Sequence, residues 1–147
     1  GAQALTLAEE KQKNALEHML GCLVRGEPVQ VYTGEAARDI LHVDDVCSAI
    51  HTIVNAGPST LDTTYNVGRG TSVRMWDVIQ YARERLRSTS EVTLVAPPRF
   101  HQLVQVDSFH MDTTKLRALG WQPSMTIWES VDRVIAGIQA KERAAAL

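Results

Sequence analysis

The chain has 147 residues, of which 44% are hydrophobic and 22% are charged, and its formal net charge at pH 7 is −2. This balance predicts no basic surface for nucleic acid, and no apolar run approaches the roughly 20 residues that a helix needs to cross a bilayer, so neither nucleic acid nor a membrane is expected as a partner. A chain of this length can bury a core, and we predict a single domain over 1–147, with a helical segment at 1–26 and an α/β lobe at 27–147.

The first part of the chain changes from a helical to a strand-like pattern. Thr6-x-x-Glu9 is a capping box, in which each side chain satisfies a backbone amide at the start of a helix. Apolar residues then keep helical spacing over 16–23. The stretch PVQVY at 28–32 alternates as a strand does, and RDILHV at 38–43 is a second strand candidate.

The middle of the chain predicts two helices separated by a strand. Asp44 is expected to cap a helix of about twelve residues. TTYNV at 63–67 is a third strand candidate, and the loop Gly68-Arg69-Gly70 follows it. A cap at Thr71 or Ser72 then begins an amphipathic helix over about 73–88.

The last third begins with VTLV at 92–95, a fourth strand candidate that two prolines stop. Residues 99–111 have the pattern of irregular or extended chain, and Asp112 is expected to cap a short helix that reaches Leu119. Thr126-x-x-Glu129 is a second capping box and begins the last helix. Strands that alternate with helices predict an α/β fold with a small sheet of about three to five strands.

No residue pattern predicts a metal site or a catalytic nucleophile. The five histidines lack the spacing of metal ligands, and no G-x-S-x-G turn presents a serine. Cys22 and Cys47 are far apart in sequence and form no C-x-x-C pair, which favours a reducing, cytoplasmic environment. Both cysteines have apolar neighbours at helical spacing, so we expect them to pack in the core.

The glycine pair Gly68-x-Gly70 invites a dinucleotide-binding interpretation, because it lies between a strand and a helix. The full fingerprint needs a third glycine where Val73 stands, and it needs a carboxylate at the end of the next strand, which has none. The pattern is therefore typical of a tight turn, although its amides could still bind a substrate phosphate.

Two arginines are candidates for phosphate binding. Arg38 follows a turn and enters a predicted strand, and Arg99 follows two prolines that stiffen its backbone. A guanidinium on a rigid segment can bind phosphate through two parallel hydrogen bonds. The alternative for Arg38 is an ion pair with Asp39, Asp44 or Asp45.

Four pieces of the sequence, taken together, resemble a known family. They are VYTG with RDILHVDDV at 31–46, YNVG at 65–68, an arginine at 99, and DTTKLRALGWQP at 112–123. In this order they resemble the C-terminal half of the extended short-chain dehydrogenase/reductases, which include the NAD-dependent epimerases and dehydratases of nucleotide sugars. The resemblance extends over about residues 16–138.

The resemblance implies a substrate-binding lobe and four substrate-binding residues. By analogy with the family, Tyr32 would lie near the nucleotide base and Arg38 would bind phosphate. Asn66 would border the nucleotide, and Arg99 would contact phosphate or ribose. Arg99 is followed by Phe-His, where the family often has Pro-Gly.

Two motifs on which the family's reaction depends are absent from this sequence. One is the glycine-rich turn that binds NAD(P), which belongs to the Rossmann half of the family fold. The other is Y-x-x-x-K, whose lysine lowers the pKa of the catalytic tyrosine. The residues four positions after Tyr32, Tyr65 and Tyr81 are Ala36, Arg69 and Arg85. We therefore expect no catalytic residue and no bound cofactor in this chain, with NAD(P) implied only for a Rossmann half.

Three interpretations remain open. The chain is a fragment or excised domain of a full-length enzyme, a short protein that binds a nucleotide sugar or works with a separate Rossmann chain, or an interaction module that keeps the fold without the ligand. The family fold packs the helix after the Arg-Asp pair against the Rossmann domain. Here that helix, at 44–56, carries the apolar residues Val46, Cys47, Ile50, Ile53 and Val54. We predict that these residues are covered by a second copy in a homodimer or by a Rossmann partner, unless the helix folds back on its own sheet.

Overall fold

The structure is a computed structural model that describes residues 14–33, 37–104, 106 and 108–146. The first predicted capping box, at residues 6–9, lies outside the described residues. The described elements are α2 (Ala15–Arg25), β1 (Val29–Tyr32), β2 (Ala37–Arg38), α3 (Val43–Asn55), the 3-10 turn η1 (Pro58–Thr60), β3 (Val73–Arg74), α4 (Met75–Leu86), β4 (Val92–Val95), α5 (Arg99–Val104), α6 (Thr114–Ala118) and α7 (Ile127–Ala145). No helix within the described ranges has the length and apolar character needed to cross a membrane.

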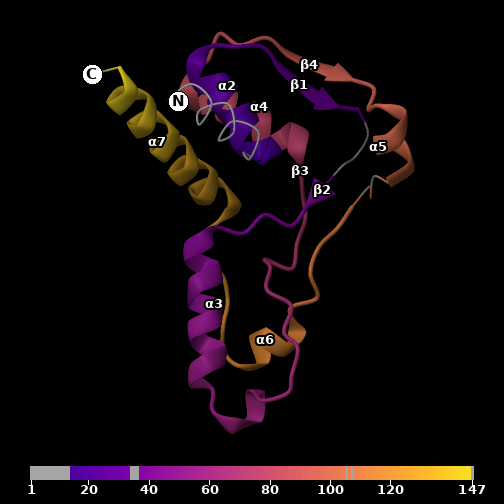
Figure 1. The fold of residues 1–147 in the computed structure, drawn as a ribbon, viewed down its shortest axis with the longest axis vertical. Helices are drawn as coiled ribbons and strands as arrows, with labels where there is room; N and C mark the ends of the chain where they lie inside the picture. Colours follow the sequence, from indigo (N-terminus) through magenta and orange to yellow (C-terminus); the bar gives the residue numbers. More distant parts are fainter. Residues whose placement is uncertain (1–13, 34–36, 105, 107, 147) are drawn as a thin grey trace, which may run out of the picture.

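The predicted α/β class is confirmed, and the described strands form two separate pairs. β1 and β4 are parallel, from Val29 opposite Val92 to Tyr32 opposite Val95. β2 and β3 are antiparallel and very short, with Ala37 opposite Arg74. Because β1 and β4 run in the same direction, their carboxyl ends lie at one edge, and α5 follows directly from the end of β4 (Figure 1).

The main hydrophobic core lies between β1 and the three helices α2, α4 and α7, which form the upper part of Figure 1. Each helix contributes an apolar stripe at a spacing of three or four residues, which places its large side chains on one face. Buried core residues from these helices include Leu20, Leu23, Ile79, Val131 and Ile135. Full burial of a side chain of this size contributes roughly 1.5–3 kcal/mol, so this cluster dominates the stability of the upper part.

A second, smaller core lies in the lower part of Figure 1, between α3, α6 and the segment after α6. Ala49 of α3, Leu116 of α6 and Trp121 are buried there. The indole Nε1 of Trp121 donates a hydrogen bond of 2.9 Å to the Ser48 hydroxyl, so the polar end of this ring is satisfied. Ile53 packs against the same cluster and therefore faces inward.

Local sequence signals predicted several elements correctly. β1 and β4 lie at the predicted strands, and α2 ends at Gly26, whose φ of 74° is the left-handed conformation that glycine adopts easily. The second capping box is confirmed at α7: the Thr126 hydroxyl accepts from the Glu129 amide, and the Glu129 carboxylate accepts from the Thr126 amide. These contacts hold the pKa of Glu129 below its ordinary value.

The predicted strand at 38–43 is wrong beyond Arg38. The chain leaves β2 at once because His42 caps α3, with its ring Nδ1 accepting a hydrogen bond of 3.1 Å from the Asp44 amide. The cap is thus His42 and not Asp44. The predicted strand at 63–67 is also wrong, since this stretch is irregular in the described structure and pairs with no described strand.

Three further boundaries differ from the prediction. α4 begins at Met75, and its N-cap is Arg74 instead of Thr71 or Ser72, because β3 comes between the glycine turn and the helix. Residues 99–104, predicted to be irregular, form α5. α6 begins at Thr114, and Asp112 contributes a side chain that accepts hydrogen bonds from the Thr114 amide and hydroxyl.

The two cysteines occupy different environments. Cys22 is buried in the main core, as predicted, and burial raises the pKa of its thiol. Cys47 is exposed, so the prediction that it packs in the core is wrong. The reason is that Cys47 lies on the side of α3 that faces away from Trp121 and Leu116.

Asp45 connects α3 to the segment that precedes α7. Its side chain is fully buried, and Oδ1 accepts hydrogen bonds from the Ser124 amide (2.9 Å) and the Ser124 hydroxyl (2.7 Å). Burial alone would raise the pKa of the Asp45 carboxyl, but the hydrogen bonds from Ser124 and Met125 and the charge of Arg69 outweigh it and hold the pKa below its ordinary value. The ionised carboxylate therefore stabilises this junction.

We expect Asp45→Ala to lower the free energy of unfolding by about 2–3 kcal/mol at neutral pH, because the substitution leaves the Ser124 amide and hydroxyl without their acceptor. Because the folded-state pKa is lowered, the contribution of Asp45 is complete above the pKa of an unfolded aspartate, about 3.9, and is lost as pH falls through the folded-state value. Urea denaturation between about pH 6 and pH 3 measures this loss.

In the same series, Asp45→Asn removes the titrating group, so its stability should fall less than that of the natural chain as the pH is lowered. Asp62→Asn is the matched control, because Asp62 is exposed and has a φ of 55°, which asparagine tolerates. Equal pH dependence in Asp45→Asn and the natural chain would contradict this account of the junction.

Candidate functional site

Two of the predicted site residues lie at the carboxyl ends of the parallel strands. Tyr32 is the last residue of β1 and is 38% exposed, and Arg99 is the first residue of α5, which begins four positions after the end of β4 (Figure 1). In α/β proteins, ligands bind preferentially at this end of parallel strands, where loops leave the sheet. The positions of Tyr32 and Arg99 therefore agree with a binding site at this edge.

Arg38 lies in β2, where two backbone carbonyls hold its guanidinium. Nη1 donates to the carbonyl of Ala37 (2.9 Å) and to that of Val106 (2.7 Å). The second contact joins β2 to the segment after α5, which is 68 residues away in sequence. Neither contact neutralises the charge of the guanidinium, because both acceptors are uncharged.

The alternative that Arg38 pairs with Asp39, Asp44 or Asp45 is wrong. Asp44 forms an ion pair of 2.9 Å with Arg133, and Asp45 accepts from Ser124. The Asp39 carboxylate accepts only from backbone amides in the described structure. None of these three carboxylates forms an ion pair with Arg38.

Large apolar side chains of β4, α5 and the segment after α5 are exposed to solvent. Those of α5 and the segment after it are Phe100, Leu103, Val106 and Phe109, of which Leu103 is 79% exposed. Leu94 of β4 is also exposed. A cluster of exposed apolar and aromatic side chains beside cationic groups is typical of a ligand-binding surface, because such side chains gain free energy only when a partner covers them.

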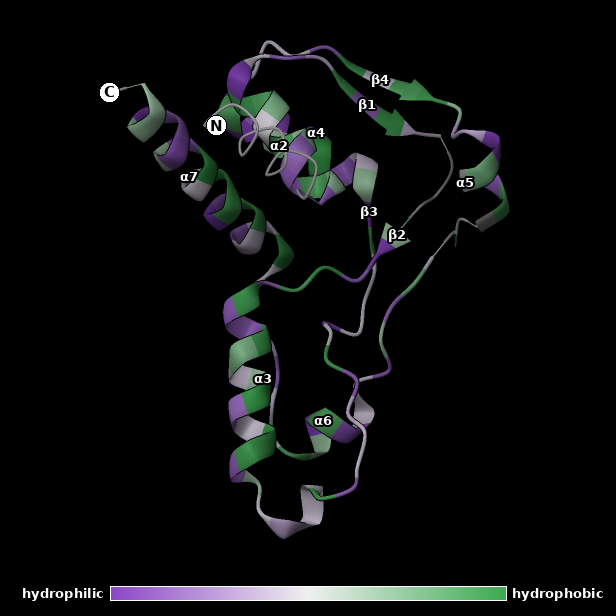
Figure 2. Cartoon of the chain, in the orientation of Figure 1, coloured by the Kyte–Doolittle hydropathy of each residue, from purple (hydrophilic) through white to green (hydrophobic). Residues whose placement is uncertain are grey.

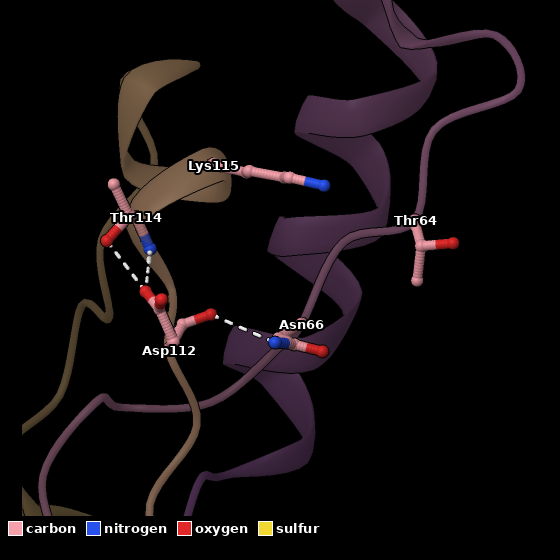
Figure 3. A pocket seen from close by; sticks show the side chains of 5 residues that line it. All are labelled: Thr64, Asn66, Asp112, Thr114 and Lys115. Carbon is pink, nitrogen blue, oxygen red and sulfur yellow. Dashed lines mark hydrogen bonds between the residues drawn. The ribbon is translucent and has the colours of Figure 1, made fainter.

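Asn66 lies in a different place, beside a small open pocket near α6. The pocket has a volume of about 170 Å³ and is lined by Thr64, Asn66, Asp112, Thr114 and Lys115 (Figure 3). The amide Nδ2 of Asn66 donates to the backbone carbonyl of Asp112 at 3.1 Å. Figure 1 places α6 well below α5 and the ends of β1 and β4, so the structure does not bring Asn66 together with Tyr32 and Arg99.

Sequence reasoning missed the polar residues that line this pocket. Asp112, Thr114 and Lys115 belong to the D-T-T-K stretch, from which we predicted the start of a helix and a family resemblance but no binding residue. The Asp112 carboxylate accepts from the Thr114 hydroxyl (2.6 Å) and the Thr114 amide (3.0 Å), and these bonds hold the pKa of Asp112 below its ordinary value. The carboxylate, the lysine amine and the Asn66 amide can therefore offer both acceptors and donors to a small polar ligand.

Asp39 is a second residue whose role the sequence did not reveal. Its Oδ1 accepts from the Arg69 amide (2.8 Å), and its Oδ2 accepts from the amides of Gly70 (2.9 Å) and Met111 (3.1 Å). The amides of the glycine turn therefore bind a carboxylate of the same chain. This contradicts the alternative in which they bind a substrate phosphate.

The first glycine of this turn is required by space and not by backbone conformation. A Cβ at Gly68 would lie 2.6 Å from Oδ2 of Asp39 and 2.7 Å from Cβ of Met111, which is closer than real side-chain carbons approach. The small residue thus lets the turn come close enough for its amides to reach the carboxylate. The close approach of Gly68 to Asp39 was not predicted, because the two residues were interpreted separately in the sequence.

Comparisons with known proteins place these observations in a family. Residues 11–134 match the family model described as GDP-mannose 4,6 dehydratase. The dTDP-glucose 4,6-dehydratase of Xanthomonas campestris pv. campestris is 31% identical over 119 residues, which is 75% of this chain and 33% of that protein. The CDP-abequose synthase of Salmonella typhimurium is 27% identical over 126 residues, which is 82% of this chain and 41% of that protein.

Solved structures show the same fold. A UDP-glucose 4-epimerase of Thermotoga maritima, determined with UDP-glucose, has a TM-score of 0.73 at 20% identity, over 88% of this chain and 40% of that one. An epimerase of Methanothermobacter thermautotrophicus has a TM-score of 0.79 at 14% identity, over 90% of this chain and 39% of that one. The chain spans about a third to two-fifths of the length of the proteins that it matches. With most of its residues matched by the family model, the chain belongs to the GDP-mannose 4,6-dehydratase family.

Proposed function

We propose that this chain is the nucleotide-sugar-binding region of an NAD-dependent epimerase or dehydratase. The observation that carries the proposal is the environment of Arg38. Its guanidinium is held by two carbonyls, has no described carboxylate partner, and contacts the segment that bears the exposed apolar side chains. The names of similar proteins, among them dTDP-glucose 4,6-dehydratase and CDP-abequose synthase, support a sugar linked to a nucleoside diphosphate as the ligand class.

The geometry of Arg38 suits a diphosphate. Both described hydrogen bonds of the guanidinium use Nη1. The edge formed by Nε and Nη2 carries two parallel N–H groups, which is the arrangement that binds two oxygens of one phosphate. Tyr32, at the end of β1, would face the base, and Arg99, at the start of α5, would contact phosphate or ribose. Asn66 would contact a more distant part of the ligand, because it lies beside α6.

Within this proposal the chain binds substrate but does not carry out the reaction by itself. NAD(P), which supplies hydride transfer in such enzymes, does not fit the residues present. The turn at 68–70 lacks the third glycine of the fingerprint, and the amides of Arg69 and Gly70 already bind Asp39. A Rossmann region would have to supply the cofactor site and the catalytic tyrosine. The two free cysteines support a cytoplasmic location for such a protein.

We expect Arg38→Ala to weaken nucleotide-sugar binding by about ten- to a hundredfold, which corresponds to about 1.5–3 kcal/mol for a charge-assisted bidentate contact. The ligand is first chosen by thermal shift from a panel of UDP-, dTDP-, GDP- and CDP-linked sugars. Calorimetry then measures the dissociation constant of the chosen ligand for the natural chain and for Arg38→Ala. A panel in which no compound shifts the melting temperature would favour the alternative function, an interaction module that keeps the fold without the ligand.

The matched control for Arg38 is Arg143→Ala, which removes an arginine from the last turn of α7, in a different part of the molecule. It should leave the affinity unchanged. If Arg38→Ala also leaves the affinity unchanged while both variants stay folded, the phosphate-binding role of Arg38 is wrong.

We also expect the 147-residue chain alone to show no saturable binding of NAD(P)(H) at micromolar concentrations and no epimerase or dehydratase turnover. The reason is that the sequence has neither the glycine-rich fingerprint nor a Tyr-x-x-x-Lys pair. Calorimetry with NAD and NADP measures the first part, and product analysis with the same panel of nucleotide sugars measures the second. Micromolar NAD binding would contradict the division of roles proposed above.

The outer face of α3 is a candidate surface for a protein partner. Figure 2 shows hydrophobic residues along the length of this helix. Val43, Cys47, Ile50 and Val54 recur at intervals of three or four residues and are exposed, with Val54 73% exposed. Ile53, which we expected on this face, instead packs inside against the second core.

For the chain on its own, we infer that a second copy covers this face. Residues 46–61 contain no Asp, Glu, Lys or Arg, so two copies of the face can meet around a twofold axis without opposing like charges. The family fold instead offers a Rossmann region as the partner, and that partner would compete for the same residues.

We predict a dimer of the isolated chain at tens of micromolar by analytical ultracentrifugation. Ile50→Glu with Val54→Glu should convert it to a monomer, because both side chains are exposed and a buried charge opposes the contact. Leu103→Glu, on exposed α5, is the control and should leave the dimer intact. If the natural chain is a monomer, the predicted dimer is wrong. If the dimer persists in the variant with both α3 substitutions, the contact lies on another surface.

A further inference from the structure

The strongest feature that the proposed function does not use is the Asp39 carboxylate. It accepts three backbone hydrogen bonds of 2.8 to 3.1 Å, from the amides of Arg69, Gly70 and Met111. These amides belong to two segments that are 30 to 72 residues away from Asp39 in sequence. One side chain therefore holds three separate parts of the chain at a single point.

The segment that ends at Met111 is the one that orients Arg38. Its Val106 carbonyl accepts the 2.7 Å hydrogen bond from Nη1 of Arg38. Between these two points the segment is attached to β2, because Ser108 forms a parallel bridge with Ala37 and the Phe109 amide donates to the Ala37 carbonyl at 3.1 Å. The segment thus contacts three consecutive residues: Ala37, Arg38 and Asp39.

The same Ala37 carbonyl accepts from both Nη1 of Arg38 and the Phe109 amide. A shift of the segment relative to β2 would therefore change both acceptors of the guanidinium together. The Met111 amide bond to Asp39 opposes such a shift, since it fixes the segment at its far end. Asp39 acts on Arg38 through this segment, because in the described structure the two side chains share no direct contact.

We propose that Asp39 is a positioning residue for Arg38: by holding the glycine turn and Met111, its carboxylate keeps the guanidinium aimed at the phosphate of the ligand. This rests on the proposed function, since it takes Arg38 as the phosphate ligand. The role requires a carboxylate. Both oxygens are used as acceptors, and an asparagine would place an NH₂ group against at least one donating amide.

The test is a double-mutant cycle of Asp39→Asn and Arg38→Ala, with calorimetry against the best nucleotide sugar of the panel. Asp39→Asn should weaken binding by about three- to tenfold when Arg38 is present, and by less than about twofold in the Arg38→Ala background. Equal effects in both backgrounds would overturn the proposal, because Asp39 would then act without Arg38. Circular dichroism confirms that each variant is folded at the temperature of measurement.

Nuclear magnetic resonance separates failure of this inference from failure of the proposed function. In Asp39→Asn without ligand, the amide signals of Arg69, Gly70 and Met111 and the side-chain Nε–Hε signal of Arg38 should all shift. An unchanged Arg38 side-chain signal would overturn the positioning role. If the Arg38 signal shifts but Arg38→Ala does not alter affinity, the positioning role stands and the phosphate-binding role fails.

If Asp39→Asn does not fold, hydrogen exchange in the natural chain gives the result. Ligand binding at Arg38 should slow exchange of the three amides held by Asp39, because coupling between two sites is reciprocal. Binding that leaves the exchange of the Met111 amide unchanged would overturn the proposal.

Discussion

The geometry in the middle of this molecule depends on one carboxylate, that of Asp39, which accepts hydrogen bonds from three backbone amides. Asp39 directly follows β2, and the next two residues, Ile40 and Leu41, pack against the main core and the second core respectively. The three hydrogen bonds of Asp39 therefore fix the backbone where the chain passes from one core to the other. The charged acceptor makes these bonds stronger than bonds between neutral groups, and Gly68 removes the side chain that would block them.

A second carboxylate, in the first turn of α3, has the corresponding role. Asp45 is buried and binds Ser124, which attaches the lower core to the beginning of α7 and so to the upper one. The R-D-x-x-x-x-x-D spacing of this stretch thus places two carboxylates that hold distant segments together, beside an arginine whose guanidinium donates to two backbone carbonyls. Charged residues that are close together in this stretch make different contacts, because the groups that they bind come from different distant segments of the chain.

The elements that sequence could predict are those determined by neighbours along the chain. The capping box of α7, the alternation of β1 and the apolar run of β4 that two prolines stop are local signals, and all three elements were confirmed. The predicted strand at 63–67 has suitable residues, but no described strand lies beside it to accept its hydrogen bonds. The same limit applies to the site. The resemblance indicated Arg38 as a phosphate ligand, whereas the Asp39–Met111 hydrogen bond and the pocket that Lys115 lines together with Asn66 join residues far apart in sequence.

The outer face of α3 contains a cysteine whose reactivity indicates whether this face is exposed or covered. Cys47 is exposed on that face, whereas Cys22 is buried and burial raises the pKa of its thiol, so its reactive thiolate form is disfavoured. An alkylating reagent should therefore modify the chain at a single position. Because Cys47 lies within the uncharged stretch 46–61, its rate of alkylation follows whether the face is open to solvent or covered, with no label added to the protein.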